Sequence, residues 1–234
     1  MLKEYIEYRV MDFLSRSEYV NKITFIGGTC LRMAFGIERF SEDLDFDCKG
    51  LSDDEFKDMT DSILIFLQRS GFEAEIRDKD NSKLTAMRRN IYFPEMLFNL
   101  GISNYMDERF LMKIEAQDQG VDYARERRII RGCGVVFPFS IPTPNVLQSM
   151  KISAFLKRAK GRDIYDIMFL SGFAKPDFPF LSARVGISDD KMLKEAIDKK
   201  LSEIDLEAKS RDFKHLLLNP ESFTGFSPEV LRDL

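Results

Sequence analysis

The sequence lacks tryptophan, contains a single histidine and has only three cysteines. His215 alone cannot build a multi-histidine metal site, and a histidine-dependent catalytic triad would rest on this one residue. The cysteines Cys30, Cys48 and Cys133 are odd in number and show no Cys-x-x-Cys spacing. We therefore expect neither a disulfide framework nor a zinc site.

Long hydrophobic runs are also missing, since none approaches the ~18 apolar residues that span a bilayer. The N-terminal residues mix acidic and basic side chains and resemble no signal or transit peptide, so we expect a cytoplasmic protein without membrane contact. The net charge of −4 indicates that any nucleic-acid contact comes from a local basic patch. The 234 residues suffice for one large domain or two small ones.

Residues 25–47 form the most informative stretch. A short apolar run, residues 23–26, is followed by Gly27, Gly28 and Thr29 and then by apolar residues at helical spacing. This pattern predicts a strand, a tight turn and a helix. Glycines let the backbone approach a ligand closely, and the N–H groups at a helix start favour phosphate.

The end of the same stretch alternates acidic and apolar residues. On a strand, Asp43, Asp45 and Asp47 share one face, with neighbouring Cα atoms roughly 7 Å apart. Mg²⁺ is typically held by one or two carboxylates together with substrate phosphates. A phosphate-binding turn followed closely by a carboxylate pair is therefore the layout of a metal-dependent nucleotidyl-transfer site.

The patterns Gly-Gly-Thr-x-Leu-Arg and Arg-Phe-Ser-Glu-Asp-Leu-Asp-Phe resemble the nucleotidyltransferase toxins of the abortive-infection AbiEii/AbiGii type, which belong to the polymerase-β-like nucleotidyltransferases. The resemblance implies that the turn from Gly27 to Thr29 binds the nucleotide. It also implies that Asp43 and Asp45 hold Mg²⁺ or Mn²⁺. Arg32, on the helix after the glycine turn, and Ser41, just before the acids, are further nucleotide-binding candidates, although Ser41 could also cap a turn or accept a modification.

A two-metal site commonly uses a third carboxylate from a neighbouring strand. Glu115, flanked by apolar residues in a predicted strand, is our candidate for a catalytic metal ligand. The superfamily often has Asp here, so this position departs from its pattern. Asp118 is an alternative, and a third ligand could also be absent.

A second stretch, residues 150–167, resembles the later motif of the same family. On that match Lys151 reaches the triphosphate, while Asp163 and Asp166 orient basic groups or shape the base pocket. Helical spacing places Lys151 and Arg158 on one face of a helix. Asp163 could instead cap the following helix.

The remaining sequence organises around these motifs. Residues 72–76, 85–93, 110–116 and 135–139 are predicted strands of one mixed sheet, and helices are predicted at residues 2–15 and behind the capping-box signature that begins at Ser52. Thr143 and Pro144 suit a helix start, and the chain beyond them is helical in period. We expect an α+β fold with a nucleotidyltransferase-like half, residues 1–140, and a helical half, residues 141–234, that closes the cleft.

The function predicted is transfer of an NMP from an NTP to an acceptor hydroxyl, with release of pyrophosphate. The resemblance implies a toxin of a toxin–antitoxin or phage-defence system, a cognate antitoxin and an RNA acceptor such as a tRNA end. Two alternatives stay open: a nucleotide-binding regulatory module without turnover, and nucleotidylation of a protein or small molecule. Basic clusters to examine for RNA contacts are Arg88, Arg89, Arg125, Arg127, Arg128 and Arg131.

Overall fold

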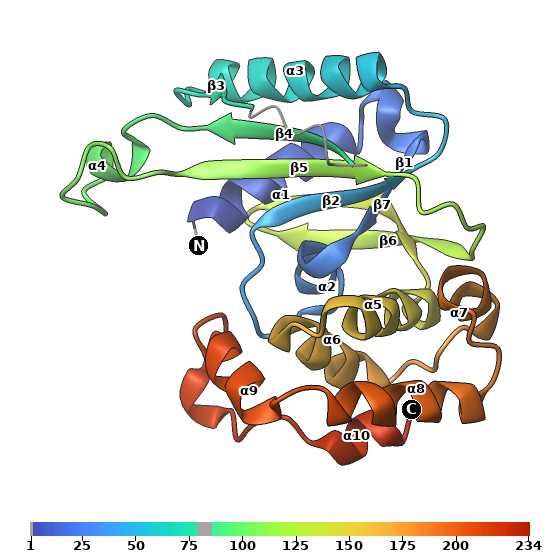
Figure 1. Ribbon diagram of the computed structural model, residues 1–234. Coiled ribbons are helices and arrows are strands. Elements are labelled where there is room, and N and C mark those ends of the chain that lie inside the picture. Colours follow the sequence, from blue (N-terminus) through green and yellow to red (C-terminus); the bar gives the residue numbers. More distant parts are fainter. Residues whose placement is uncertain (1, 79–85) are drawn as a thin grey trace. The chain divides into compact units, whose positions relative to one another are not determined.

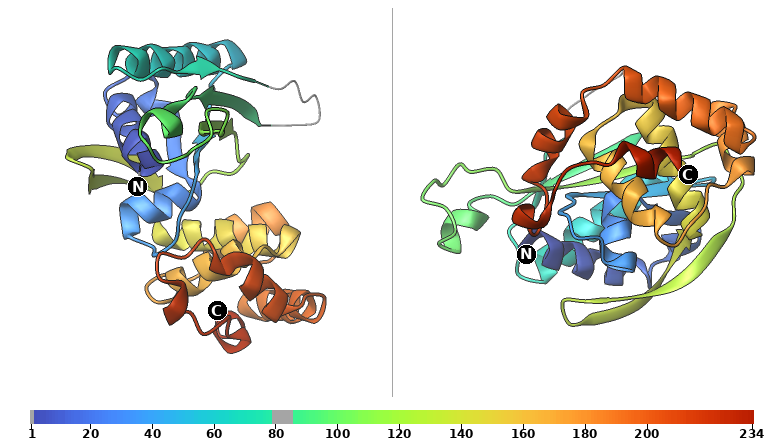
Figure 2. Two further views of the ribbon diagram at one scale, coloured as in Figure 1. Left: turned by 90° about the vertical axis from the view of Figure 1, so that its left-hand side faces the viewer. Right: turned by 90° about the horizontal axis from the view of Figure 1, so that it is seen from below.

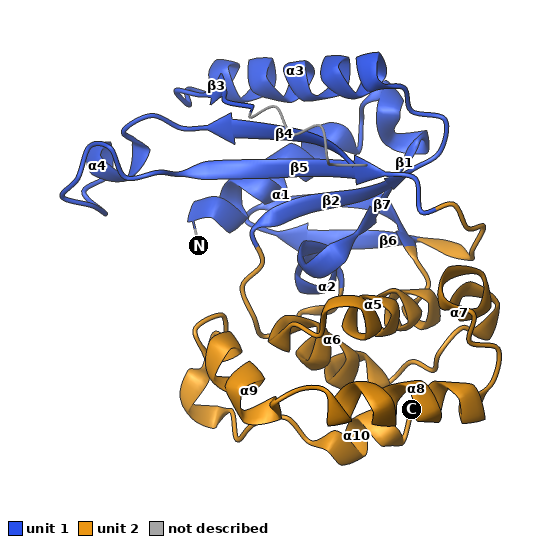
Figure 3. Ribbon diagram, in the orientation of Figure 1, with its two compact units in different colours: residues 1–34, 42–119, 127–141 blue, residues 35–41, 120–126, 142–234 orange. Residues whose placement is uncertain are grey.

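The computed structural model describes residues 2–78 and 86–234, and Figures 1 and 2 show its elements. The chain divides into two compact units (Figure 3). Unit 1 comprises residues 1–34, 42–119 and 127–141. Unit 2 comprises residues 35–41, 120–126 and 142–234, so two short segments from before residue 142 belong to the helical unit.

Unit 1 is built on a five-stranded mixed sheet in the order β1-β2-β5-β4-β3. Strand β2 runs parallel to β5, while the pairs β1–β2, β4–β5 and β3–β4 are antiparallel. The strands are β1 (Ile23–Ile26), β2 (Asp43–Cys48), β3 (Glu75–Ile76), β4 (Met87–Tyr92) and β5 (Leu111–Gln117). The predicted strand of residues 85–93 begins at a residue that lies outside the described part of the chain.

Helices complete this unit around the sheet. They are α1 (Leu2–Leu14), α2 (Gly27–Phe35), α3 (Asp53–Arg69) and the short α4 (Met96–Asn99), with a 3₁₀ turn η1 (Glu18–Asn21). The capping box is present at α3, because the Ser52 hydroxyl accepts from the Glu55 N–H and the Glu55 carboxylate accepts from the Ser52 N–H. Helices α1 and α3 pack together through the stacked rings of Phe13 and Phe66.

One predicted strand belongs to a different sheet from the one expected. Strand β7 (Val135–Pro142) pairs with β6 (Arg125–Gly132) in a separate two-stranded sheet and does not join the five-stranded one. The connection, Cys133 and Gly134, has positive φ at both residues, 49° and 81°. This is the backbone geometry of a two-residue hairpin turn. Such a turn pairs β7 with β6, the strand that directly precedes it in the sequence.

Unit 2 is helical apart from its two short segments. Its helices are α5 (Pro144–Arg158), α6 (Gly161–Ser171), α7 (Phe178–Val185), α8 (Asp190–Ser202), α9 (Leu206–Lys214) and α10 (Pro228–Arg232), with a 3₁₀ turn η2 (Pro220–Ser222). Thr143 is the N-cap of α5 and Pro144 its first residue, as the sequence predicts. Two prolines, Pro176 and Pro179, lie at the start of helix α7, where the same residues would also suit a turn.

The core of unit 2 is apolar and centres on α5, α6 and α8. Phe155, Ile164 and Ile167 are fully buried there against Leu193 and Ile197. In the described part of the chain, no helix combines the length and the apolar character needed to cross a membrane.

Candidate functional site

Three carboxylates gather on one face of the sheet in unit 1. Asp43 and Asp45 share a face of β2, and the parallel register sets Asp45 directly beside Glu115 on β5. Their alternate neighbours Leu44 and Ile114 are fully buried on the other face. The alternation of burial along both strands therefore turns all three acids toward the same side of the sheet. Asp118, the alternative third carboxylate, lies one residue beyond the end of β5 and is exposed.

The glycine turn lies directly against the second of these acids. Gly27 begins α2 with φ of +82°, and Ile26 pairs with Asp45 across the β1–β2 ladder. A Cβ atom at Gly27 would overlap the Asp45 carboxylate. Only glycine both adopts this backbone conformation at little cost and leaves room for the carboxylate.

A hydrogen bond ties the same helix to the start of β2. The Thr29 hydroxyl is buried and donates to the Asp43 carbonyl oxygen at 2.6 Å. The side chain of Thr29 is therefore engaged within the fold, and a phosphate contact from this residue would come from its backbone N–H. The first four N–H groups of an α-helix have no partner within the helix, and α2 begins at Gly27, which lies against the Asp45 carboxylate.

Two cationic side chains lie among the carboxylates. Lys113 Nζ is 2.7 Å from Asp43 Oδ2 and 3.6 Å from Glu115 Oε1. Arg88, which faces Glu115 across the β4–β5 ladder, brings Nη2 within 2.6 Å of Glu115 Oε1. This face of the sheet thus concentrates negative charge, and it already holds one cation, the Lys113 ammonium group, between Asp43 and Glu115.

This donor set fits a metal ion that is shared with a substrate. Within the described residues, no three His, Cys, Asp or Glu side chains are arranged to hold a metal by themselves. Mg²⁺ in phosphoryl-transfer sites typically takes one or two carboxylates and completes its shell with phosphate oxygens and water. Asp43 and Asp45 meet that requirement once the metal replaces Lys113 at Asp43, and Glu115 would have to exchange its contacts with Arg88 and Lys113 to become a ligand.

A fourth acid lies buried near these residues. Glu7 on α1 is 1% exposed, and its Oε1 atom has no hydrogen-bond partner among the described residues. Burial raises the pKa of Glu7 to about 8; Lys3 opposes this effect, while the charges of Glu4, Asp43 and Glu42 add to it. Glu7 therefore holds a proton at neutral pH beside a sheet face that is already acidic.

Unit 2 contains a buried ionic cluster around Asp166. This carboxylate is fully buried and accepts two hydrogen bonds from Arg39, Nε to Oδ1 at 2.5 Å and Nη2 to Oδ2 at 2.7 Å. Lys151 Nζ lies 2.8 Å from Asp166 Oδ2. Burial by itself would raise the pKa of Asp166, but Lys151 and Arg39 hold the pKa below its ordinary value. The cluster fixes the positions of both cations.

The remaining candidates are also placed by the structure. Asp163 is buried and forms a bidentate pair with Arg158, whose side chain is 46% exposed. Arg32 lies on α2, with its Nε 3.0 Å from the Glu4 carboxylate of α1. Ser41 is half-buried in the unit 2 segment that precedes β2. The candidates thus form two groups, one around the acids of unit 1 and one around Asp166 of unit 2.

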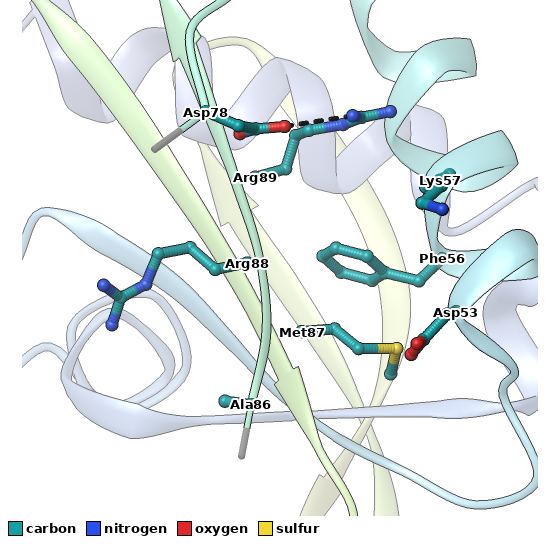
Figure 4. A pocket seen from close by; sticks show the side chains of 8 residues that line it. All are labelled: Asp53, Phe56, Lys57, Asp78, Ala86, Met87, Arg88 and Arg89. Carbon is teal, nitrogen blue, oxygen red and sulfur yellow. Dashed lines mark hydrogen bonds and ion pairs between the residues drawn. The ribbon is translucent and has the colours of Figure 1, made fainter. Parts of the chain in front are cut away.

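A separate pocket of about 290 Å³ lies between the start of α3 and β4 (Figure 4). Arg89 is bound there to Asp78 and to the Thr60 hydroxyl. In the figure the side chain of Arg88 points away from those of Phe56 and Met87. The lining residues are Asp53, Phe56, Lys57, Asp78, Ala86, Met87, Arg88 and Arg89. Because neither Asp43 nor Asp45 is among them, this pocket is not the acid site.

Sequence reasoning did not place four residues at these sites, and it named one of them, Arg88, only as a possible RNA contact. Lys113 could have been found, because it stands two positions before Glu115 and so shares its face of β5. Arg39 lies in the quoted motif, but nothing local indicates that it is buried against a residue 127 positions away. The position of Arg88 beside Glu115 depends on how β4 and β5 pair, which the sequence does not reveal. Glu7 looks like an ordinary polar residue of an amphipathic helix.

The mixed sheet, with its acid pair beside a glycine-initiated helix, belongs to a fold that is shared with solved structures. JHP933 from Helicobacter pylori matches with a TM-score of 0.59 and 20% identity, over 98% of this chain and 86% of that one. The nucleotidyltransferase toxin MenT4 from Mycobacterium tuberculosis matches with a TM-score of 0.54 and 16% identity, over 86% of this chain and 66% of that one. No curated protein sequence matches the chain.

The family follows from the sequence match. Residues 9–229 match the family described as nucleotidyl transferase AbiEii toxin, type IV toxin–antitoxin system. The chain belongs to this family and is a toxin nucleotidyltransferase. The family resemblance and the α+β nucleotidyltransferase fold predicted from the sequence are both confirmed.

Proposed function

We propose that the protein transfers an NMP from an NTP to an acceptor hydroxyl of RNA, such as a tRNA end, in a reaction that depends on Mg²⁺ or Mn²⁺. The observation that carries the proposal is the contact between Gly27 and Asp45. It sets a helix start suited to phosphate directly against a strand whose acids are suited to a cation.

The unit 1 residues bind the donor nucleotide. The backbone N–H groups of Gly27, Gly28 and Thr29 hold the β- and γ-phosphates. Asp43 and Asp45, with Glu115 as a further candidate, hold the metal. The metal neutralises phosphate charge and aligns the attacking and leaving oxygens. Arg32 on α2, and Ser41 in the unit 2 segment that precedes β2, are further proposed nucleotide contacts.

The unit 2 residues supply positive charge. An ammonium group has three donors, so the contact with Asp166 does not exhaust Lys151, which we assign to the triphosphate. Arg158, held by Asp163, is proposed as a second phosphate contact, and Asp166 orients the cations that it binds. The acceptor hydroxyl oxygen forms a bond to the α-phosphorus, the α–β anhydride bond breaks, pyrophosphate leaves and the hydroxyl proton passes to solvent.

The biological setting is part of the same proposal. Membership of a toxin–antitoxin family supports a cognate antitoxin encoded with this chain. A cytoplasmic location would provide both the NTP and the RNA.

The test is incubation of the purified protein with Mg²⁺, each labelled NTP and total cellular RNA. An Asp45→Asn variant removes the charge beside Gly27. Asp54→Asn is the matched control, because the Asp54 side chain is 93% exposed on α3 and touches none of the proposed site. We expect label to enter RNA from one NTP with the wild-type and control proteins, and to be lost with Asp45→Asn.

The other outcomes separate the alternatives. Label in a protein or a small molecule, with none in RNA, would replace the proposed acceptor by one of those classes. NTP binding without pyrophosphate release under any condition would refute turnover and support a regulatory module. Transfer that persists without a divalent cation would refute the metal assignment.

A further inference from the structure

We infer that one face of strand β6 is the surface that holds the sugar–phosphate backbone of the RNA acceptor. The face consists of Arg127, Ile129 and Arg131, which alternate with residues of the opposite face. All three are exposed, and Ile129 is 55% exposed. The β6–β7 hairpin that carries them is the yellow-green pair of strands in Figure 2. The inference rests on the proposed function only for the identification of RNA as the acceptor.

The structure separates these arginines from the other basic clusters of the sheet unit. Arg88 is bound to Glu115, and Arg89 is bound to Asp61 and Asp78. Arg128 points to the other face of β6 and donates to the Ala34 carbonyl at 2.8 Å. These side chains serve the fold and are engaged before any ligand arrives.

The β6 face differs because nothing among the described residues holds its cations Arg127 and Arg131. In the part of the chain that the structure describes, the side chains of Arg127 and Arg131 make neither an ion pair nor a hydrogen bond. No acidic residue lies between them on that face, since Glu126 is turned the other way. A protein with net charge −4 thus presents a purely positive stripe on one strand.

The chemistry of the face fits a phosphodiester chain. Four residues of strand set the Cα atoms of Arg127 and Arg131 roughly 13 Å apart, so each side chain can engage a different phosphate. A guanidinium group binds phosphate through two parallel hydrogen bonds and can also stack on a base. Ile129 between them, and the 60% exposed Val136 on β7, offer apolar contact to ribose and base.

The experiment measures binding of a fluorescent 20-nucleotide oligouridylate as a function of salt, without NTP or metal. The test variant is Arg127→Gln/Arg131→Gln. The charge-matched control is Arg69→Gln/Arg109→Gln, which removes two exposed arginines elsewhere in unit 1. Each phosphate contact contributes about 0.7 to the slope of log affinity against log salt for single strands. We expect the slope to fall by about 1.4 in the test variant and to stay unchanged in the control.

Folding is checked with a conservative variant. Arg127→Lys/Arg131→Lys keeps both charges, so it should keep the salt slope. Its affinity should fall, because lysine cannot make the two parallel hydrogen bonds that arginine makes to a phosphate. An unchanged slope in the Gln variant would overturn the inference. Displacement of the RNA by polyglutamate from the wild type, at equal charge concentration, would also overturn it and assign the face to an acidic protein.

Turnover separates this inference from the proposed function. With RNA as acceptor, the Gln variant should raise KM for RNA several-fold and leave kcat and NTP binding unchanged. If wild-type protein binds the oligonucleotide through this face but never modifies RNA, the proposed acceptor fails while the surface assignment stands. If RNA is modified with an unchanged KM in the variant, the surface assignment fails and the proposed function stands.

Discussion

Replacing Glu7 by glutamine should make the protein more stable at neutral and alkaline pH. Unfolded Glu7 titrates near 4.5, and burial raises the pKa of the folded carboxyl to about 8. The folded state therefore binds one more proton between these values. The stability that this proton contributes is fully present below pH 4.5 and is lost as the pH rises through 8.

The magnitude follows from the separation of the two pKa values. One unit corresponds to 1.36 kcal/mol, so ionisable Glu7 costs about 3 kcal/mol at pH 7 and about 5 kcal/mol at pH 9 relative to pH 4. Glutamine has nearly the shape of the protonated acid and cannot ionise. Glu7→Gln should therefore match the wild type near pH 4.5 and exceed its free energy of unfolding by these amounts at higher pH.

The assay is urea unfolding at pH 4.5, 7 and 9 for the wild type, Glu7→Gln and a control, Glu73→Gln. Glu73 is an exposed carboxyl in the loop before β3. Other titrating groups change all three proteins alike, so the difference from wild type isolates the substituted residue. A difference that is the same at every pH would refute the reasoning, because it would show that Glu7 does not change protonation on unfolding.

Three further outcomes are expected. Gly71→Ala forces alanine into a left-handed backbone and should cost roughly 1–2 kcal/mol in unfolding experiments, and Gly27→Ala should cost more because its Cβ also overlaps the Asp45 carboxylate. Only Gly27→Ala should abolish nucleotidyl transfer, and an equal loss of activity in both variants would contradict the close-contact argument. Asp166→Asn leaves two buried cations without their counter-charge and should cost about 3–5 kcal/mol by denaturant titration, whereas a cost below about 1 kcal/mol would show that the cluster is solvated. Thr29→Val removes the hydrogen bond to Asp43 and should cost about 1 kcal/mol in unfolding experiments; an unchanged melting temperature would count against that bond.

The acid site could be predicted because its signals are local. Alternation along β2 reveals which face Asp43 and Asp45 share, and apolar neighbours mark Glu115 as a strand residue. The glycine turn also indicated close approach, although the group that approaches Gly27 is the Asp45 carboxylate itself. These features depend only on the periods of strands and helices and on the conformational freedom of glycine.

What could not be predicted depends on contacts between distant residues. Strand β6 was not predicted, because its exposed arginines obscure the alternation of apolar and polar residues along the strand. Without β6 as a partner, β7 was assigned to the wrong sheet. The ion pair of Arg39 with Asp166 crosses 127 residues, and no periodicity reports such a distance. Proline favours both turns and the first turn of a helix, so the two prolines at the start of α7 do not by themselves reveal that helix.

The pairing of Arg39 with Asp166 has a consequence for how the protein can be made. The ribosome synthesises the arginine well before the carboxylate that completes its environment. The segment that carries it, residues 35–41, also gives its Phe40 N–H to the carbonyl of Leu216, close to the end of the chain. A fragment that starts at residue 142 lacks both contacts, so the helical unit cannot be excised by a single cut. During translation it reaches its final form only after Leu216 has been synthesised.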